Sequence, residues 1–146
     1  MALAMDCAAL NVFLDRVFPQ IADQVRVESV DAQMLIARLR VDDRHLRPGG
    51  TVSGPSMFAL ADVTIYLAIL ARIGEVALAV TTNASIDFMR KPEAGRDLRA
   101  ECGLLKLGRS LAVAEALFFS EGQPDPVARC SMTYAIPPDR GSMAVG

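Results

Sequence analysis

The fold is decided by residues 53–73, which read SGPSMFALADVTIYLAILARI and form the most apolar stretch of the chain. Gly54 breaks the preceding chain, Pro55 suits the first turn of a helix, and Gly74 is typical of a helix end. We therefore predict a helix over residues 55–73. Because this helix is apolar nearly all round, it must be enclosed on most sides, and a sheet curled about it would do so.

One carboxylate, Asp62, stands near the middle of this apolar helix. An ionised aspartate is costly to bury unless its charge is needed there. The N–H groups at the start of the helix favour the binding of an anion. Together these features indicate a site that attacks a carbonyl and holds the resulting oxyanion. The alternative is a structural role, in which Asp62 pairs with an arginine at a subunit interface.

Outside this helix the pattern predicts an α+β protein with a six-stranded antiparallel sheet in one domain, residues 1–146. An amphipathic N-terminal helix lies within residues 1–23, ends or bends near Pro19 and is expected to serve packing. From Gln24 the residues alternate with period two, and after a turn near residues 30–33 they alternate again over residues 35–41, which predicts a hairpin. The loop 42–52 then leads to the long helix. The remaining strands are predicted at 77–89, 97–107, 110–120 and 127–136, followed by a flexible tail at 139–146.

Composition argues against a nucleic-acid-binding protein and a zinc protein, and it favours a homo-oligomer. The 146 residues carry a net charge of −2, which argues against nucleic acid as the main partner. The three cysteines are widely spaced and form no zinc motif, so we expect reduced thiols, a cytoplasmic location and no metal. Since 52% of the residues are hydrophobic, we expect much surface to be buried between copies of the chain in a homo-oligomer.

The long apolar helix also meets the length criterion for crossing a membrane. Asp62 at mid-span and Arg72 at its end oppose that interpretation. The strands predicted on both sides oppose it too, because open strands could not remain in lipid. We therefore expect no membrane association.

Polar residues outside the helix supply further candidates. Thr81, Asn83, Ser85 and Asp87 fall on one face of a strand at period two, which is typical of a solvated face. Thr81, nearest the start of that strand, is our choice for a site residue, and Asn83 comes second. The only histidine, His45, lies in a polar loop beside two arginines, where we expect an exposed side chain with no catalytic role.

Two segments carry a family resemblance: RPGGTVSGPSMFALAD at residues 47–62 and ASIDFMRKP at residues 84–92, continued by Gly95 and Gly108-Arg109. They resemble the loop with the central helix, and the third strand with its following turn, of hotdog-fold acyl-CoA thioesterases of the phenylacetate-degradation type. In that family a His-Gly-Gly leads into a helix carrying Leu-Ala-Asp. The resemblance extends over residues 25–136.

The resemblance implies a hotdog fold and a homodimer, often paired into a homotetramer, that hydrolyses acyl-CoA thioesters. Such an enzyme uses neither metal nor cofactor, and coenzyme A enters as part of the substrate. The family residue that matches Asp62 acts as nucleophile or as base for a water molecule. The N–H that matches Gly54 polarises the thioester carbonyl, and the hydroxyl that matches Thr81 helps to position the water.

The chain differs from the family at three positions of the loop. Ser53 stands in place of the His, Arg47 in place of a common Asn, and Pro55 in place of the second Gly. Ser53 suits a helix N-cap and can hydrogen-bond a thioester oxygen or a water, so it stays a catalytic candidate. Since proline has no N–H, Gly54 and Ser56 remain as the pair of backbone donors for an oxyanion.

The spacing of Gly54 and Asp62 predicts that two chains form each site. Eight residues of helix rise roughly 12 Å, so the two residues of one chain cannot hold the same carbonyl. Two antiparallel copies of the helix about a two-fold axis would bring Asp62 of one copy toward Gly54 of the other, giving two equivalent sites.

Other residues are candidates for contacts with the substrate. The acyl chain is expected in a tunnel between helix and sheet, lined by Met57, Phe58 and Tyr66. Arg90 and Arg109 lie at strand ends and are expected to meet the phosphates of coenzyme A. Candidates for substrate binding also include Arg47, Ser56 and Asn83.

Three functions fit these features. The first is hydrolysis of acyl-CoA thioesters. The second is a protein of the same fold that binds an acyl-CoA or fatty acyl ligand without cleaving it. The third is an enoyl or hydroxyacyl thioester hydratase, for which only His45 could serve beside Asp62.

Overall fold

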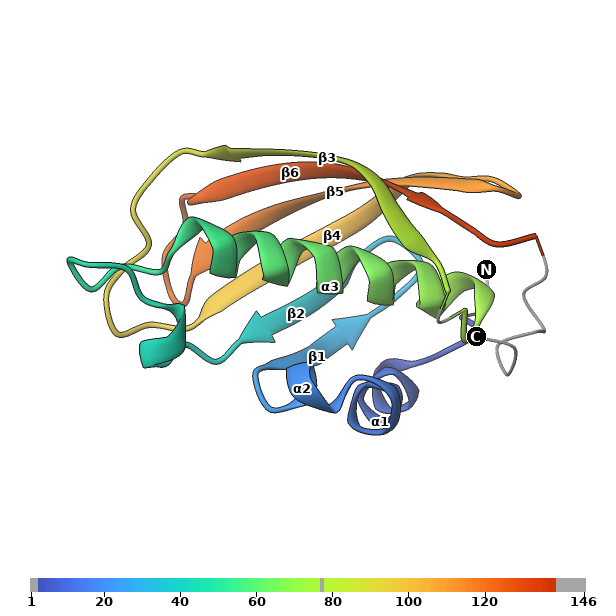
Figure 1. Cartoon of the computed structure of the whole chain (residues 1–146), viewed down its shortest axis with the longest axis horizontal. Coiled ribbons are helices and arrows are strands. Elements are labelled where there is room, and N and C mark those ends of the chain that lie inside the picture. The colour runs from blue at the N-terminus through green and yellow to red at the C-terminus, as the bar shows by residue number, and fades with distance from the viewer. Residues whose placement is uncertain (1–2, 77, 139–146) are drawn as a thin grey trace.

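Figure 1 shows the computed structural model of the chain, which describes residues 3–76 and 78–138. Its helices are α1 (Cys7–Val17), α2 (Pro19–Ala22), the short 3-10 helix η1 (Asp43–His45) and α3 (Gly54–Ile73). Its strands are β1 (Val25–Val30), β2 (Leu35–Leu39), β3 (Val80–Phe88), β4 (Leu98–Leu107), β5 (Leu111–Ser120) and β6 (Ala128–Ala135). The long helix and all the predicted strands are present. The predicted flexible tail lies outside the described residues.

The strands form one six-stranded antiparallel sheet in the order β1-β2-β4-β5-β6-β3. This sheet curves around α3, which lies along its concave face, while α1 and α2 lie beside β1 (Figure 1). The predicted hairpin is β1–β2. The arrangement confirms the predicted fold, a hotdog fold with an additional N-terminal helix.

Alternation along the strands explains how the sheet encloses the helix. On β6, Ala128, Cys130, Met132 and Tyr134 are buried, while the residues between them are partly exposed. The buried side chains of β5, among them Phe118, alternate in the same way. One face of the sheet therefore packs on α3, as expected for an antiparallel sheet with one apolar face.

The sheet does not cover α3 all round. Phe58 and Ala59 are exposed, and Asp62 and Tyr66 are partly exposed, so one stripe of the helix remains uncovered. By length and composition α3 could cross a membrane, but 67% of its most apolar 18 residues are buried inside the fold. Core helices of soluble proteins can be as long and as apolar.

The break between α1 and α2 follows from Pro19. Proline lacks an N–H and disfavours helical geometry at the residue before it. Phe18 accordingly has φ −132° and ψ 57°, outside the helical region. The prediction that the N-terminal helix ends or bends here is confirmed. α1 itself packs through its buried residues Leu10, Phe13 and Leu14.

β3 is an edge strand that is exposed along most of its length. A bulge changes its register, so that Thr81 pairs with Tyr134 whereas Asn83 pairs with Thr133. Since cross-strand partners share a face, Thr81 lies on the inner face with the buried Tyr134, and Asn83 lies on the outer face. The prediction that Thr81 and Asn83 share a face is therefore wrong, because one extra residue shifts the alternation.

All three cysteines are free thiols. Cys102 and Cys130 both lie opposite Ala116, so strand β5 separates them. Burial raises the pKa of the Cys130 thiol to about 11 and raises the pKa of the Cys102 thiol as well. Both therefore stay protonated near neutral pH, which makes them poor nucleophiles.

Candidate active site

Asp62, in the middle of α3, is held by two hydroxyl groups from neighbouring strands. Thr81, at the start of β3, donates from Oγ1 to Asp62 Oδ1 at 2.5 Å. The Tyr134 hydroxyl, on β6, lies 2.5 Å from the same Oδ1 and 2.9 Å from the Asp62 backbone oxygen. We call these three residues the carboxylate clamp. Both hydroxyls meet Oδ1, so the clamp fixes this carboxylate oxygen, and neither hydroxyl engages Oδ2.

Asp62 is not part of an ion pair within the described part of the chain. Nine ion pairs between an arginine and a carboxylate form there, and none of them includes this carboxylate. Neutral hydroxyl donors stabilise the charge instead. No arginine in the described part of this chain pairs with Asp62, and the structural alternative, an arginine at a subunit interface, stays a prediction.

Tyr134 is a site residue that the sequence analysis did not single out. Its side chain is 3% exposed, and its ring stacks on Tyr66 with centroids 6.1 Å apart. Burial, followed by the hydrogen bond to Asp62, raises the pKa of the Tyr134 phenol above its ordinary value. The hydroxyl therefore stays protonated and donates. The available signal was a phenol on the apolar face of an alternating strand, since a buried tyrosine hydroxyl usually needs a partner.

A cavity of about 450 Å³ lies beside the carboxylate clamp. Apart from the clamp itself, its lining is almost entirely apolar and comes from α1, α2, α3 and the start of β3. Tyr66 lines this cavity, as predicted for the acyl tunnel, whereas Met57 and Phe58 do not. The volume is within the range of small-molecule sites.

The N-terminus of α3 is capped as predicted. The Ser53 hydroxyl accepts the Ser56 N–H at 3.2 Å and lies 3.0 Å from the Ser56 hydroxyl. The Ser56 N–H thus has an acceptor inside the chain, so of the two predicted backbone donors Gly54 is the better candidate. Gly54 is the first residue of α3, where an N–H has no acceptor within the helix. A role of Ser53 toward substrate stays a prediction.

Replacing Ser53 by alanine is expected to lower the free energy of unfolding by about 1 kcal/mol, because the Ser56 N–H loses its acceptor. Urea titration measures the change. Ser53→Asp, which keeps an acceptor at the N-cap, is the control and should stay close to wild type. An alanine variant as stable as the wild type would show that this cap does not stabilise α3.

A second cavity, of about 400 Å³, lies at the Gly54 end of the helix. Arg47, Met57 and Arg90 line it together with Gly54. The ring of Phe88 also lies against Gly54, where a Cβ atom would be 3.4 Å from the ring. The structure therefore groups four of the predicted site residues at this end.

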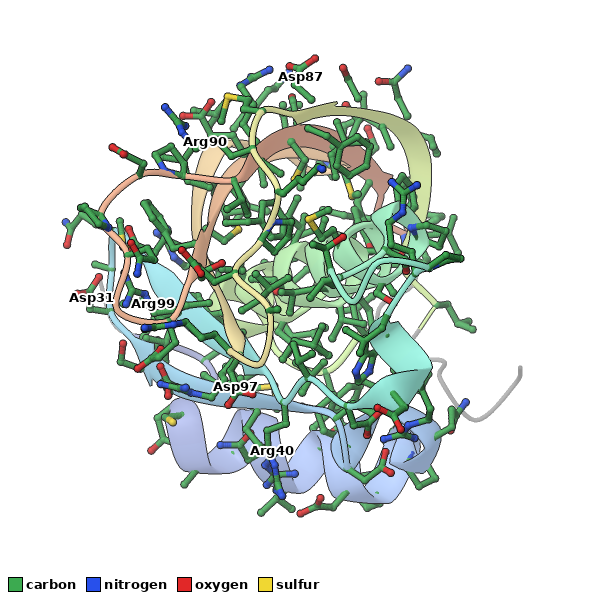
Figure 2. The ribbon with its side chains drawn as sticks, turned by 90° about the vertical axis from the view of Figure 1, so that its left-hand side faces the viewer. Asp31, Arg40, Asp87, Arg90, Asp97 and Arg99 are labelled. Atoms are coloured by element: carbon green, nitrogen blue, oxygen red, sulfur yellow. The ribbon has the colours of Figure 1, made fainter. Side chains whose placement is uncertain are left out.

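The cationic candidates lie at opposite ends of the sheet. Arg90 follows β3 at the end where Phe88 pairs with Ala128, and its guanidinium donates to the Pro126 carbonyl at 2.7 Å. Figure 2 looks onto this end, where Arg90 lies at the rim of the molecule. Arg109 is exposed in the turn before β5, at the other end. One chain therefore does not bring Arg90 and Arg109 together.

Other predicted residues lie apart from both cavities. Asn83 is on the outer face of the sheet, and Phe58, 39% exposed, belongs to the uncovered stripe of α3. Ser56 lines a smaller cavity with His45. Among residues 3–76 and 78–138, no three His, Cys, Asp or Glu side chains are grouped so as to hold a metal ion.

His45 is buried, so the prediction of an exposed histidine is wrong. The Asp42 N–H donates to Nδ1 at 2.9 Å, and Nε2 lies 2.9 Å from Gln24 Oε1. Because Nδ1 accepts, Nε2 carries the proton and donates to Gln24. The His45 carbonyl also accepts the Ser53 N–H at 2.7 Å. The loop folds back on Gln24, and His45 thereby fixes the chain that leads into α3.

Comparisons with known proteins identify the family of the chain. The family model described as the thioesterase superfamily matches residues 49–127, more than half of the chain. The chain is 59% identical to a candidate thioesterase from Silicibacter sp. TM1040, whose crystal structure superposes with a TM-score of 0.89 over 94% of this chain and 96% of that one. It is 33% identical, over 91 residues, to a candidate esterase of Pseudomonas aeruginosa, covering 62% of this chain and 68% of the relative.

A third similarity is to a mutant of the phenylacetic acid degradation protein PaaI from Thermus thermophilus. The identity is 26% and the TM-score 0.69, over 82% of this chain and 99% of that chain. Fold and family agree with the resemblance found in the sequence, and they support hydrolysis of thioesters as the general activity. The chain therefore belongs to the thioesterase superfamily and has its hotdog fold.

Proposed function

We propose that the protein hydrolyses acyl-CoA thioesters in two equivalent sites of a homodimer, either alone or paired into a homotetramer. The observation that carries the proposal is the carboxylate clamp, which presents Asp62 on the wall of an apolar cavity. An apolar pocket with a few convergent polar groups is the usual form of a small-molecule site.

In the proposed reaction Asp62 acts as general base or as nucleophile. As a base it takes a proton from water, whose oxygen attacks the carbonyl carbon of the thioester. As a nucleophile it attacks that carbon itself, and water then hydrolyses the mixed anhydride. In both routes the carbonyl oxygen becomes an oxyanion, the C–S bond breaks, and coenzyme A leaves as a thiolate that is then protonated. Thiolate is a good leaving group, so neither a Ser-His-Asp triad nor a metal or cofactor is part of the proposal.

The oxyanion is proposed to accept a hydrogen bond from Gly54 of a second copy of the chain. Within one chain, eight residues of helix separate Gly54 from Asp62 by roughly 12 Å, and the two residues line different cavities. The uncovered stripe of α3, with Phe58 and Ala59, supports a helix-to-helix contact between copies. The exposed edge strand β3, where Val80 is 55% exposed, supports a contact at the same face.

The same pairing would bring cations from two chains to one substrate. Arg109 lies at the sheet end that carries Thr81, whereas Arg47 and Arg90 lie at the Gly54 end. If Asp62 of one copy meets Gly54 of the other, these arginines approach the same coenzyme A from both chains. Arginine is well suited to bind phosphate. We further propose a cytoplasmic protein with no nucleic-acid or membrane partner, in keeping with the net charge of −2.

Release of free coenzyme A from a panel of short, long and aromatic acyl-CoAs tests the proposal. We expect turnover of at least one member. If a ligand instead raises the melting temperature and is recovered intact after long incubation, the protein is a binding protein of the same fold. For the hydratase alternative, His45 would have to give up a hydrogen bond to Asp42 or Gln24, which engage both of its ring nitrogens. Normal activity in His45→Ala would remove that alternative.

Replacing Tyr134 by phenylalanine is expected to lower kcat by roughly 10- to 150-fold with a smaller change in KM. The substitution keeps the ring but removes one hydrogen bond to a charged group, which is worth on the order of 1.5–3 kcal/mol. Steady-state kinetics measures both constants. Thr133→Val, on the outer face of the same strand, is the control. An unchanged kcat in Tyr134→Phe would remove Tyr134 from the site.

A further inference from the structure

We propose that the N-terminal helices α1 and α2 form one wall of the acyl pocket and set the size of the acyl group that the site accepts. The inference rests on the proposed function. It assigns to these helices a role in substrate selection, beyond the packing expected from the sequence. The ligand that they would contact is an apolar acyl group, aliphatic or aromatic.

The cavity beside the carboxylate clamp has two chemically different sides. The clamp supplies the polar groups, and Phe13, Val17, Phe18 and Ile21 of the N-terminal segment line another part with apolar side chains. A thioester carbonyl placed at Asp62 therefore has an apolar wall within reach. Since the coenzyme A moiety is large and polar, the acyl group is the part of the substrate that matches this wall.

The apolar wall is open to the cavity. Val17 is 37% exposed, and Phe18 and Ile21 are partly exposed, although all three are cavity-lining. A row of aromatic rings connects α1 with the clamp. The ring centroids of Phe13 on α1 and Tyr66 on α3 are 6.0 Å apart, and Tyr66 stacks on Tyr134 of the clamp. This row of rings provides flat apolar surfaces that lead away from the carboxylate.

The cavity, of about 450 Å³, is of the size of small-molecule sites, and the N-terminal segment forms part of its lining. Replacing a lining residue by a larger one should therefore reduce the length of the longest acyl group that the cavity accepts.

α1 is fixed to its neighbours, so a substitution on its cavity side changes the pocket rather than the position of the helix. The Asn11 amide donates to the Val27 carbonyl at 3.0 Å, and its oxygen accepts the Val27 N–H at 2.9 Å. These bonds satisfy the N–H and the carbonyl of Val27 on the side of β1 that pairs with no other strand of the sheet. Asp15 adds an ion pair with Arg26 at 2.8 Å.

The test compares two identical substitutions on α1. Val17→Phe adds bulk inside the cavity, while Val12→Phe adds it at a position that is 60% exposed and outside the cavity. kcat/KM is measured for straight-chain acyl-CoAs from acetyl to palmitoyl and for an aromatic acyl-CoA. For Val17→Phe we expect a loss of about tenfold or more on the longest group that the wild type accepts, and about the wild-type value for acetyl-CoA. Val17→Ala should shift the preference toward longer groups, and Val12→Phe should keep the wild-type profile.

Identical chain-length profiles for Val17→Phe, Val12→Phe and the wild type would overturn the inference. So would equal losses on all substrates in Val17→Phe with an unchanged melting temperature. A wild type that hydrolyses no member of the panel would refute the proposed function instead. In that case the shift in melting temperature with free carboxylic acids of increasing length makes the same comparison: a shorter limit in Val17→Phe alone supports the wall, and equal limits refute it.

Discussion

Replacing Asp62 by asparagine is expected to lower kcat for acyl-CoA hydrolysis by a factor between about 10² and 10⁴. Asparagine has nearly the same shape, and its carbonyl oxygen can still accept the hydrogen bonds from Thr81 and Tyr134. It can neither take a proton from water nor attack the thioester. The fold should therefore remain and the chemistry should fail. Release of free coenzyme A under saturating substrate measures the effect.

Asp87→Asn is the matched control for this variant. Asp87 lies on β3 near its end, on the outer face of the sheet, and pairs with Arg129 at 2.8 Å. Because the pair is exposed, its loss should hardly change stability or turnover. Full activity in Asp62→Asn across the substrate panel would show that the assigned chemistry is wrong.

Replacing Gly54 by proline is the variant with the second-largest expected effect. Proline removes the backbone N–H that is proposed to stabilise the oxyanion, and loss of one such donor lowers kcat by about 10²- to 10³-fold. The first turn of a helix tolerates proline. Ser53, with φ −74° and ψ 155°, already has the extended conformation that a residue before proline prefers. The measurement is kcat at saturating substrate, with circular dichroism to confirm the fold.

Gly54→Ala separates the N–H from the volume at this position. Alanine keeps the donor and adds a Cβ atom 3.4 Å from the Phe88 ring, which is an ordinary contact distance. We expect a much smaller loss of kcat than in Gly54→Pro. Equal losses in the two variants would mean that space at this position matters and the N–H does not.

Much of the fold follows from local patterns in the sequence. The apolar run at residues 53–73, Pro55 at its start and Gly74 at its end were enough to place α3, and Gly74 indeed has φ 89°. Alternation predicted the hairpin and the last strand, turn compositions separated the strands between them, and Pro19 predicted the break between α1 and α2. Such signals are readable because each depends on one residue or on one period. For residues 111–119 the pattern alone fitted a helix or a strand, and the neighbouring segments with the family resemblance favoured the strand.

Features that depend on register or on distant partners were not readable. The bulge in β3 moves Asn83 to the outer face, and no residue type marks it. His45 looks exposed in a polar loop, but its partner Gln24 lies 21 positions away in the chain.

The candidate site likewise has residues that local patterns predicted and residues that only the tertiary fold brings together. Asp62 and Thr81 were predicted, and they do lie in contact. Tyr134 was missed because it is 72 residues from Asp62, and only the pairing of β3 with β6 brings it there. The part of the cavity lining that comes from α1 and α2 was missed, because the apolar face of an amphipathic helix has the same sequence pattern whether it packs on the core or borders a ligand pocket.

The central claim, that each site takes Asp62 from one chain and Gly54 from another, is tested most directly by a mixed dimer. Chains with Asp62→Asn and chains with Gly54→Pro are co-expressed under different affinity tags, and the mixed species is isolated by two successive purifications. The account predicts that both parents are nearly inactive and that the mixed dimer recovers about half of the wild-type activity, because one of its two sites is intact. A mixed dimer no more active than its parents would contradict it.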